Sequence, residues 1–481
     1  MTIKRLQDMS VNRVVNGVTG KQSRYSAVTI NSFPYYDTDP LVGMVAGQYN
    51  NYGQIPGNGN LNNLSNTLYA GSLQSISDNI HGDYNAFYYG SATVTFRTFV
   101  ADSNDVSVFP SLVVGKKYCV AKCAGNATLT YKNNLPVLIA GIGAGGGGGV
   151  TSGGGGGAGV FYSTSYNMKR ISNGISVTVG GATLAGVGAT DASGYATGNA
   201  YGAGTFVTAI DNSSNYILAC EGGNPGSSPN SYTNYYGAGG GYLSGSSTSD
   251  AGWNSYGTGG GGAGSTVASA NSPTSMYYYL GGEAYSTSIY STWDSTAPFV
   301  SANRKAYNGG NGSLSPSYST WRAGGGGGGT RTAGSAPTYA STLGYGTLSS
   351  YAVSGASGEQ IGGLGGRGIP WCQVFSATND GTEIGVGGQG CHSFTLSSNP
   401  NATAINAALT SLLGNSGMSY GGQHIVSGGV DQTGSTSSKG MDGAANTGNG
   451  GGGNPVSPAS TSGWGSKGGS GCVWVVFKVI G

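Results

Sequence analysis

Residues 138–167 read LIAGIGAGGGGGVTSGGGGGAGVFYSTSYN, so an apolar strand pattern leads into two runs of five glycines and out into a second strand pattern. Glycine has no Cβ atom, and neighbouring glycine backbones can therefore approach closely enough for N–H to C=O hydrogen bonds, supported by weak Cα–H to O contacts. Such packing satisfies buried backbone polar groups without an apolar interior. We expect the glycine runs to form a core; the alternative is that they are flexible linkers.

The composition argues against disorder. Glycine accounts for 95 of 481 residues, yet the chain also contains 32 tyrosines and has a formal net charge of only +2. Disordered chains usually combine high net charge with few aromatic residues. Because glycine loses more backbone entropy on folding than any other residue, hydrogen bonding between close-packed backbones is the expected compensating gain. The low charge also argues against a nucleic-acid partner, which requires clustered Lys and Arg.

Residues 91–140 have the pattern of a β-rich region, in which short apolar or β-branched runs alternate with turn residues. The runs are ATVTF, VSVFPSLVV, KYCVAKC, ATLTY and LPVLIAG. AGN at 124–126 and KNN at 132–134 are interpreted as hairpin connections, and Asn173–Gly174 as a further hairpin turn. CVWVVFKVI at 472–480 predicts a closing strand, and NATAINAALTSLLG at 401–414 predicts a helix. A small antiparallel sheet or sandwich is therefore expected.

The order of these features along the chain is an apolar strand, glycine runs, the VFYSTSYN strand, further glycine runs, and finally GGSGCVWVVFKV. This order resembles the glycine-rich domain of bacteriophage tail-fibre, tail-tip and related virion proteins, over roughly residues 135–481. The resemblance implies packed polyglycine II helices, which are extended left-handed segments with about three residues per turn. The long aromatic stretches between the glycine runs depart from the family pattern.

The expected fold class is mostly β and irregular, with a small antiparallel β region followed by a glycine-rich, polyglycine II-type domain with long loops. The expected divisions are an N-terminal arm at 1–40, a β-rich region at 41–134, and the glycine-rich domain at 135–481. Within the first 25 residues a basic cluster is accompanied by a single acid, Asp8, and this cluster is either solvated or an attachment point on an acidic partner within a virion. The cluster consists of Lys4, Arg5, Arg13, Lys21 and Arg24.

Aromatic residues in Ser-, Gly- and Asn-rich surroundings are the candidate receptor-binding residues. Tyr and Trp give a large amphipathic contact area at low entropic cost, while Ser, Gly and Asn adapt by hydrogen bonding. The alternative is that individual rings pack on the scaffold as cladding. The candidates are Tyr235, Tyr236, Tyr242, Trp253, Tyr256, Tyr277, Tyr278, Tyr279, Tyr290, Trp293 and Trp321.

Motifs for catalysis, metals and nucleotides are weak. Gly141–Gly146 matches G-x-G-x-x-G after a strand pattern, but polyglycine follows where that fingerprint requires a helix. The three histidines are isolated, and Cys119 and Cys123 lack a second pair at zinc-like spacing, so both are predicted to be small buried residues. The acid pairs Asp102/Asp105 and Asp380/Glu383 are interpreted as solvated loop acids or weak cation ligands rather than a glycosidase pair. We expect no cofactor, no metal and no enzymatic activity.

The leading hypothesis is a phage virion structural protein, a tail fibre or adhesin that presents aromatic loops to a host receptor. Its partners would be other virion proteins and a cell-surface protein or glycan, and the chain would act as a homo-oligomer or an oligomer-capping subunit. No apolar stretch at the N-terminus resembles a signal peptide, which fits assembly in the host cytoplasm and a final location in the virion. The alternatives are a capsid-decorating or head-fibre protein without receptor binding, and an ice-binding or matrix-type polyglycine protein.

Overall fold

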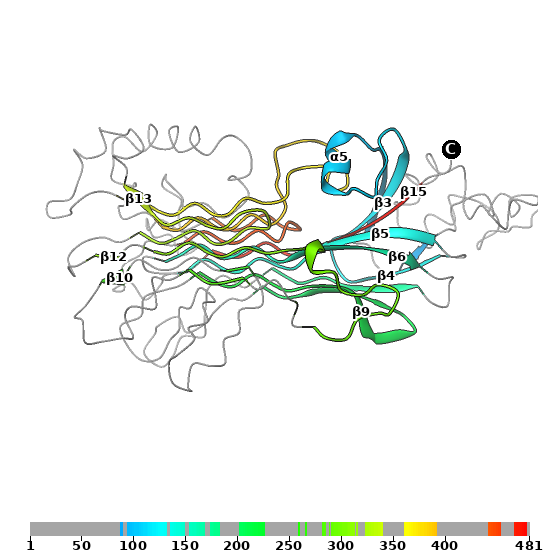
Figure 1. Cartoon of the computed structure of the whole chain (residues 1–481), viewed down its shortest axis with the longest axis horizontal. Helices are drawn as coiled ribbons and strands as arrows, with labels where there is room; N and C mark the ends of the chain where they lie inside the picture. Colours follow the sequence, from blue (N-terminus) through cyan, green and yellow to red (C-terminus); the bar gives the residue numbers. More distant parts are fainter. Residues whose placement is uncertain are drawn as a thin grey trace, which may run out of the picture.

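In the computed structural model, the described part of the chain is elongated. Its strands lie at one end, and extended segments run side by side along the rest (Figure 1). The structure describes a little under half of the chain. The described residues are 87–89, 94–131, 135–149, 153–168, 174–182, 202–226, 258–259, 265–266, 281–284, 288, 290–312, 314–315, 323–339, 360–391, 441–453 and 466–478.

Strands make up nearly all of the regular structure in this part of the chain. They are β1 Phe87–Tyr89, β2 Val94–Val100, β3 Lys117–Cys123, β4 Ala127–Tyr131, β5 Leu135–Ile142, β6 Phe161–Met168, β7 Ile175–Thr178, β8 Thr205–Ala209, β9 Asn212–Cys220, β10 Ser265–Thr266, β11 Arg304–Lys305, β12 Leu314–Ser315, β13 Thr338–Tyr339, β14 Gln360–Ile361 and β15 Cys472–Lys478. The described helical elements are α5, Ser103–Val108, and the short 3-10 helix η7, Ser301–Asn303.

Two antiparallel sheets form the strand-rich end. One has six strands in the order β11-β6-β5-β15-β3-β2, and the other has five in the order β1-β4-β7-β8-β9. β15 lies between β5 and β3, pairing Val475 with both Ile139 and Ala121. β15, the last described strand of the chain, therefore lies in the centre of the larger sheet. The expectation of a mostly β fold with an antiparallel region is confirmed.

The apolar core lies between the two sheets, which pack face to face as a sandwich. It joins Ile139 and Tyr162 of the larger sheet to Val177, Val207 and Leu218 of the smaller one, all of them buried. β15 shows how the alternation of side chains along a strand is used. Val473, Val475 and Phe477 face this core, while Cys472, Trp474 and Val476 face a second cluster on the other side of the sheet. The run CVWVVF at 472–477 is continuously apolar because both faces of the strand are covered.

The second cluster is covered by α5 and by residues around Cys372–Phe375. Phe109 and Phe375 meet edge to face there, with ring centroids 5.7 Å apart. The prediction that VSVFPSLVV at 106–114 is a strand is wrong, because its first residues belong to α5 and the rest form a turn. A capping box explains the helix: the Asp102 carboxylate accepts from the Asp105 N–H, and the Asp105 carboxylate accepts from the Asp102 N–H.

The predicted hairpins are also wrong. β3, β4 and β5 follow one another in sequence, but β4 belongs to the smaller sheet and the other two to the larger. AGN at 124–126 is therefore a crossing between sheets. β7 has β4 and β8 as its neighbours, so it does not pair back across Asn173–Gly174. Short turn-like sequences mark connections, but the sheet that each strand joins is decided by which face it must bury.

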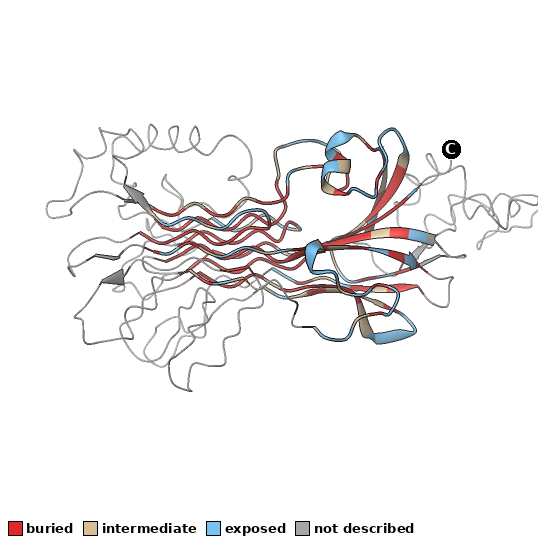
Figure 2. Ribbon diagram, in the orientation of Figure 1, coloured by how far each residue is buried: buried red, intermediate tan, exposed pale blue. Residues whose placement is uncertain are grey.

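Strands from both sheets continue directly into the glycine segments. β5 runs on into 143–149, β9 runs on into 221–226, and 153–160 and 466–471 lead into β6 and β15. These segments lie side by side along the long axis, and most of their residues are buried although they have little or no side chain (Figures 1 and 2). We call the described glycine segments together the glycine bundle.

Strands on both sides of the expected boundary at 134 share these sheets. β2 and β3 lie before it, and β3 pairs with β15, while β4 pairs with β7. The arm expected at 1–40 and the helix expected at 401–414 lie outside the part of the chain that the structure describes. Within that part, no helix is long and apolar enough to cross a membrane.

Candidate functional site

The glycine bundle is held by hydrogen bonds that return to the same neighbour at every third residue. In segment 143–149, the N–H groups of Gly143, Gly146 and Gly149 donate to Val160, Gly157 and Gly154, at 2.8–3.1 Å. The N–H groups of Gly145 and Gly148 donate to a different segment, to Gly469 and Ser466. The third direction is used by Ala144, which donates to Ala203. Three successive residues therefore bond to three different neighbours, unlike residues of a β-strand, which alternate between two.

Segment 153–160 lies inside the bundle and is bonded on many sides. Its N–H groups at 155 and 158 donate to Gly325 and Gly328, and those at 156 and 159 donate to Gly451 and Gly448. Those at 157 and 160 donate to Asn224 and Glu221, while its carbonyls at 153 and 156 accept from Cys391 and Gly388. With segment 143–149, at least five segments surround this one, and all of its residues are buried.

This packing distance excludes side chains. A Cβ placed on Gly156 would lie 2.1 Å from the Gly146 carbonyl oxygen, and one on Gly155 would lie 1.9 Å from that of Gly388. Real Cβ atoms do not approach backbone oxygens this closely, and the atoms that obstruct are backbone that is itself hydrogen-bonded. The glycines are required here by backbone proximity rather than by a left-handed φ.

Polar side chains complete the bonding where the backbone pattern is interrupted. The Asn449 Oδ1 accepts from the Val386 N–H at 2.8 Å, and the Asn224 Nδ2 donates to the Thr258 carbonyl at 3.0 Å. The Thr258 hydroxyl in turn donates to the Ala158 carbonyl. These three residues are buried, so their hydrogen bonds satisfy groups that have no access to water.

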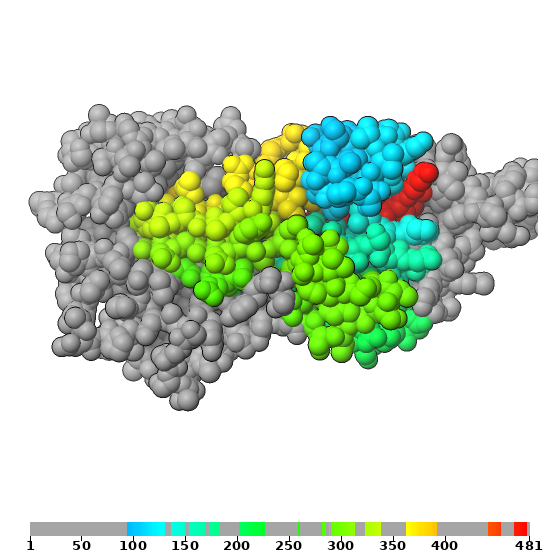
Figure 3. Space-filling model, in the orientation of Figure 1, coloured from blue at the N-terminus to red at the C-terminus, as the bar shows by residue number. Residues whose placement is uncertain are grey.

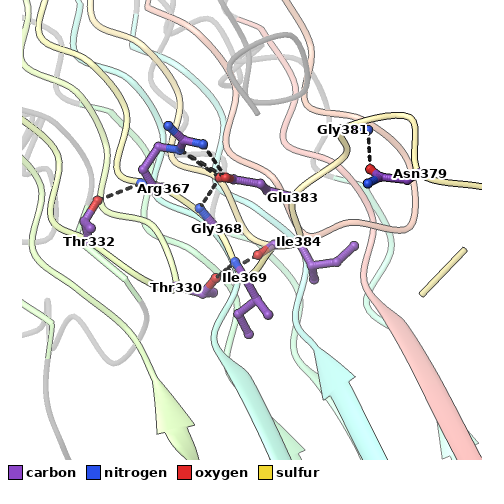
Figure 4. Close-up of polar contacts among 9 residues, drawn as sticks. All are labelled: Thr330, Thr332, Arg367, Gly368, Ile369, Asn379, Gly381, Glu383 and Ile384. Carbon is purple, nitrogen blue, oxygen red and sulfur yellow. Dashed lines mark hydrogen bonds and ion pairs between the residues drawn. The ribbon is translucent and has the colours of Figure 1, made fainter. Parts of the chain in front are cut away.

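An ion pair fixes the place where segment 362–368 meets segment 384–391 (Figure 4). The Arg367 guanidinium donates from Nε and Nη2 to the Glu383 carboxylate at 2.5–3.1 Å, and the Gly368 N–H donates to the same carboxylate at 2.9 Å. The hydrogen bond to Glu383 raises the pKa of Arg367 above its ordinary value. Glu383 was expected to be solvated, but it is only 4% exposed and works as a structural acceptor.

Asp105 is likewise not a solvated loop acid. Its carboxylate accepts from the Gln373 N–H at 2.6 Å, from the Gln373 Nε2 at 2.9 Å and from the Asp102 N–H at 2.9 Å, and the residue is fully buried. Burial raises the pKa of Asp105, although the hydrogen bonds oppose this shift. Both acid pairs considered for catalysis therefore include a buried carboxylate that is occupied by structural hydrogen bonds.

Of the candidate receptor-binding residues, the structure describes Tyr290 and Trp293. They lie on the strap, which we define as residues 290–305. At its start, the Tyr216 N–H donates to Thr292 and the Asp294 N–H donates to the Tyr216 carbonyl, so the strap extends the edge of β9. At its end, β11 pairs with β6. The strap thus closes one open side of both sheets, and on the face in Figure 3 its green residues lie on the surface beside the strands.

Tyr290 and Trp293 pack into an aromatic cluster rather than standing free. Trp293 lies 5.5 Å from Tyr162 and 5.1 Å from Phe299 between ring centroids, and Tyr290 lies 5.0 Å from Tyr216 and 5.2 Å from Phe206. Both rings are half-buried. Burial raises the pKa of the Tyr290 hydroxyl. For these two residues the structure corresponds to the cladding alternative, with part of each ring still at the surface.

The other nine aromatic candidates fall in parts of the sequence that the structure does not describe, as does the basic cluster Lys4, Arg5, Arg13, Lys21 and Arg24. For several of these aromatic stretches, the structure does describe a strand that adjoins them in the sequence. β10 precedes the stretch with Tyr277–Tyr279 and β12 precedes the one with Trp321, and the two strands pair in parallel. They lie at the end of the glycine bundle remote from the sandwich, as does β13 (Figure 1). We call this end the tip.

One charged pair was missed by sequence reasoning. Glu221 follows β9 and Arg304 begins β11, and their side chains lie 3.5 Å apart with 4% and 2% exposure. Burial lowers the pKa of Arg304, and the Glu221 carboxylate opposes that shift. A signal was available, because Glu221 is a lone acid between a strand and a glycine pair. Its partner, more than 80 residues further on, could not be identified from spacing.

All six cysteines are buried free thiols, including Cys119 and Cys123, whose predicted burial is confirmed. Among the described residues, no group of three or more His, Cys, Asp or Glu side chains could hold a metal ion. No family model matches the chain, and comparison with curated proteins and with solved structures found no match either.

Proposed function

We propose that the chain is a virion structural protein of a bacteriophage, a tail fibre or adhesin in which the glycine bundle carries receptor-binding loops. The observation that supports this most is the position of the tip. Aromatic, Ser- and Asn-rich sequence adjoins β10 and β12 at the end of the bundle that is farthest from the sandwich. The order of strands and glycine runs, which resembles that of phage tail proteins, supports the same proposal.

We infer further that the glycine bundle has polyglycine II geometry. The return to the same neighbour at every third residue corresponds to a helix with about three residues per turn. Neighbours in three directions, with no room for Cβ atoms, fit the packing of such helices. A bundle of this kind is a stiff rod, suited to holding variable loops away from a particle.

The proposed partners are a host surface protein or glycan at the tip and other virion proteins elsewhere, with the protein acting as a homo-oligomer or as the cap of one. Rigid aromatic side chains in a polar, adaptable background suit either kind of receptor. The proposed role requires no catalysis, and we expect the purified protein to leave host polysaccharide intact.

Competition with phage adsorption tests the adhesin role. Purified protein should bind susceptible cells and slow adsorption of the phage, and Trp253→Ala or Trp321→Ala should weaken both effects while leaving the melting temperature unchanged. Trp293→Ala is the matched control, since that ring packs in the sandwich. It should lower stability and leave binding intact at temperatures where the variant is folded. If the wild-type protein neither binds cells nor competes, the adhesin role is lost.

Deleting residues 1–30 tests attachment to the particle. We expect the truncated protein to bind cells but to be missing from assembled particles, because the basic cluster lies in the deleted segment. Incorporation at the wild-type level would contradict the attachment role of that cluster. Incorporation of the full chain into heads, with no adsorption activity, would instead favour the capsid-decorating alternative.

A further inference from the structure

Two asparagines hold an outer segment of the glycine bundle. Asn308 and Asn311 lie three residues apart, and their side-chain Oδ1 atoms accept from the N–H groups of Ala284 and Gly281, each at 2.8 Å. Between them, the Gly309 N–H donates to the Gly282 carbonyl at 2.8 Å. Segment 281–284 is therefore bound to segment 307–312 by two carboxamides and one backbone hydrogen bond.

Both asparagines are exposed and each is followed by glycine, at Gly309 and Gly312. In an Asn–Gly pair the backbone nitrogen of the glycine can attack the asparagine Cγ, because no Cβ obstructs its approach. A hydrogen bond to Oδ1 withdraws electron density from Cγ and stabilises the negative charge that develops on that oxygen during attack. The bonds from Ala284 and Gly281 are placed to have this effect.

We propose that Asn311, and more slowly Asn308, are sites of spontaneous deamidation in the folded protein. The glycine nitrogen forms a bond to Cγ and gives up its proton, the bond from Cγ to the side-chain nitrogen breaks, and ammonia leaves with that proton. Water then adds to one of the two carbonyl carbons of the resulting succinimide and opens the ring. The products are aspartate and isoaspartate, and no other reactant is needed.

The order of reactivity follows from the hydrogen bonds of the attacking nitrogens. The Gly309 N–H must first leave the Gly282 carbonyl, whereas no described residue accepts from the Gly312 N–H. One backbone hydrogen bond corresponds to roughly a fivefold difference in rate. Asn449–Gly450 is a matched pair within the same chain. Asn449 is fully buried, and the Gly450 N–H donates to Val386 at 2.8 Å, so in this pair the attacking nitrogen is occupied and the carboxamide is shielded from water.

The reaction changes the attachment of segment 281–284. Isoaspartate adds one methylene to the main chain between 308 and 312, which breaks the three-residue repeat on which the bonds to Gly281 and Ala284 depend. Gly281 lies directly after the sequence that contains Tyr277–Tyr279. Deamidation would therefore loosen the anchor of a stretch that the proposed function assigns to receptor binding, and it would do so with time.

To test the proposal, the intact protein is incubated at 37 °C and mildly alkaline pH, and its peptides are then analysed by mass spectrometry. Isoaspartate is detected by enzymatic methylation. We expect Asn311 to deamidate roughly fivefold faster than Asn308, and Asn449 to stay unchanged. Hydrogen exchange at 281–284 should rise as the modified fraction grows. Asn311→Gln should keep the carboxamide, suppress reaction at 311 and slow that rise.

Three results would overturn the proposal. One is reaction of Asn449 at the rate of Asn311, and another is reaction of Asn308 as fast as Asn311. The third is an unchanged Asn311 in the folded protein under conditions in which a synthetic peptide of residues 303–316 deamidates. These measurements do not depend on cell binding, so their outcome is separate from that of the adsorption experiments.

Discussion

At the scale of single residues, the glycines of the bundle are not interchangeable, because the space at each Cα differs. Gly156 and Gly181 represent the two extremes. A Cβ on Gly156 would collide with the Gly146 and Gly147 carbonyls, whereas one on Gly181 would meet nothing within 4 Å. Neither has the left-handed φ that would strain an alanine. The contrast separates the effect of backbone proximity from the general effect of replacing a glycine.

We expect Gly156→Ala to destabilise the protein by about 3 kcal/mol or more, since hydrogen-bonded backbone would have to move. Gly181→Ala should be neutral or stabilise by about 0.5 kcal/mol, because it only restricts the unfolded chain. Chemical denaturation of both variants checks the difference. Equal effects of the two substitutions would contradict close backbone packing as the reason for the glycine at 156.

Asp105 gives a second prediction at this scale. Burial raises its pKa in the folded protein above the ordinary value of 3.8, so the folded state holds its proton more tightly than the unfolded state. The contribution of this group to stability is therefore greatest below pH 3.8 and declines as the pH rises through the folded pKa. Asp105→Asn should remove this pH dependence.

At neutral pH the same substitution should cost about 1–3 kcal/mol, because an amide nitrogen would face backbone and Gln373 donors that the carboxylate now accepts from. Unfolding free energies of the two proteins measured from acid to neutral pH provide the check. Parallel pH profiles would show that Asp105 does not titrate as described.

At the scale of elements, the strap depends on the buried pair of Glu221 and Arg304. A buried charge that loses its partner is costly, so Glu221→Gln should destabilise the protein by about 3–5 kcal/mol and increase hydrogen exchange at β11. Adding Arg304→Met to that variant should recover much of the loss, because no unpaired charge then remains. Asp442→Asn, at an exposed position, serves as the control. A double variant no better than Glu221→Gln would argue against this explanation.

The elements also show how far sequence reasoning reached. β5 and β15 were predicted because their apolar runs are long and adjoin glycine-rich sequence. The burial of Cys119 and Cys123 was predicted because they lie four residues apart in an expected strand, where cysteines act as small apolar residues. α5 was missed because Val106 and Val108 favour a strand, and the capping box at Asp102 and Asp105 outweighs that preference. The hairpins failed because partner choice depends on sheet membership, which local sequence does not encode.

The candidate site was predictable only in part, for a related reason. The composition of the aromatic stretches indicates which residues suit receptor binding. It does not distinguish rings that are exposed from rings that pack against the scaffold. Tyr290 and Trp293 have the same kinds of polar and small neighbours in the sequence as the other candidates. In the structure, however, Tyr290 packs against Tyr216 and Trp293 packs against Tyr162. Burial by residues distant in the chain decides between the two roles.

At the scale of the whole molecule, two different kinds of interior are joined end to end. The sandwich has an apolar core, while the glycine bundle buries mainly peptide groups. Exposure of apolar surface raises the heat capacity on unfolding, and exposure of polar surface lowers it. We expect the heat-capacity change per residue, measured by calorimetry, to fall below the ordinary range of about 12–15 cal/mol/K. A value within that range would mean that the bundle is held by apolar burial after all.

The three-residue repeat of the bundle also governs how its length can change. Inserting one or two residues into segment 153–160 would turn every later N–H toward the wrong neighbour, whereas inserting three would restore each bond one repeat further on. The segment must lengthen together with those around it, by about 9 Å per repeat in the polyglycine II geometry that we propose. The aromatic stretches that follow β10 and β12 in the sequence are not glycine runs, so this requirement does not extend to their length. Rod length in this protein can thus evolve only in discrete steps shared among segments, while the sequences it carries can vary in length one residue at a time.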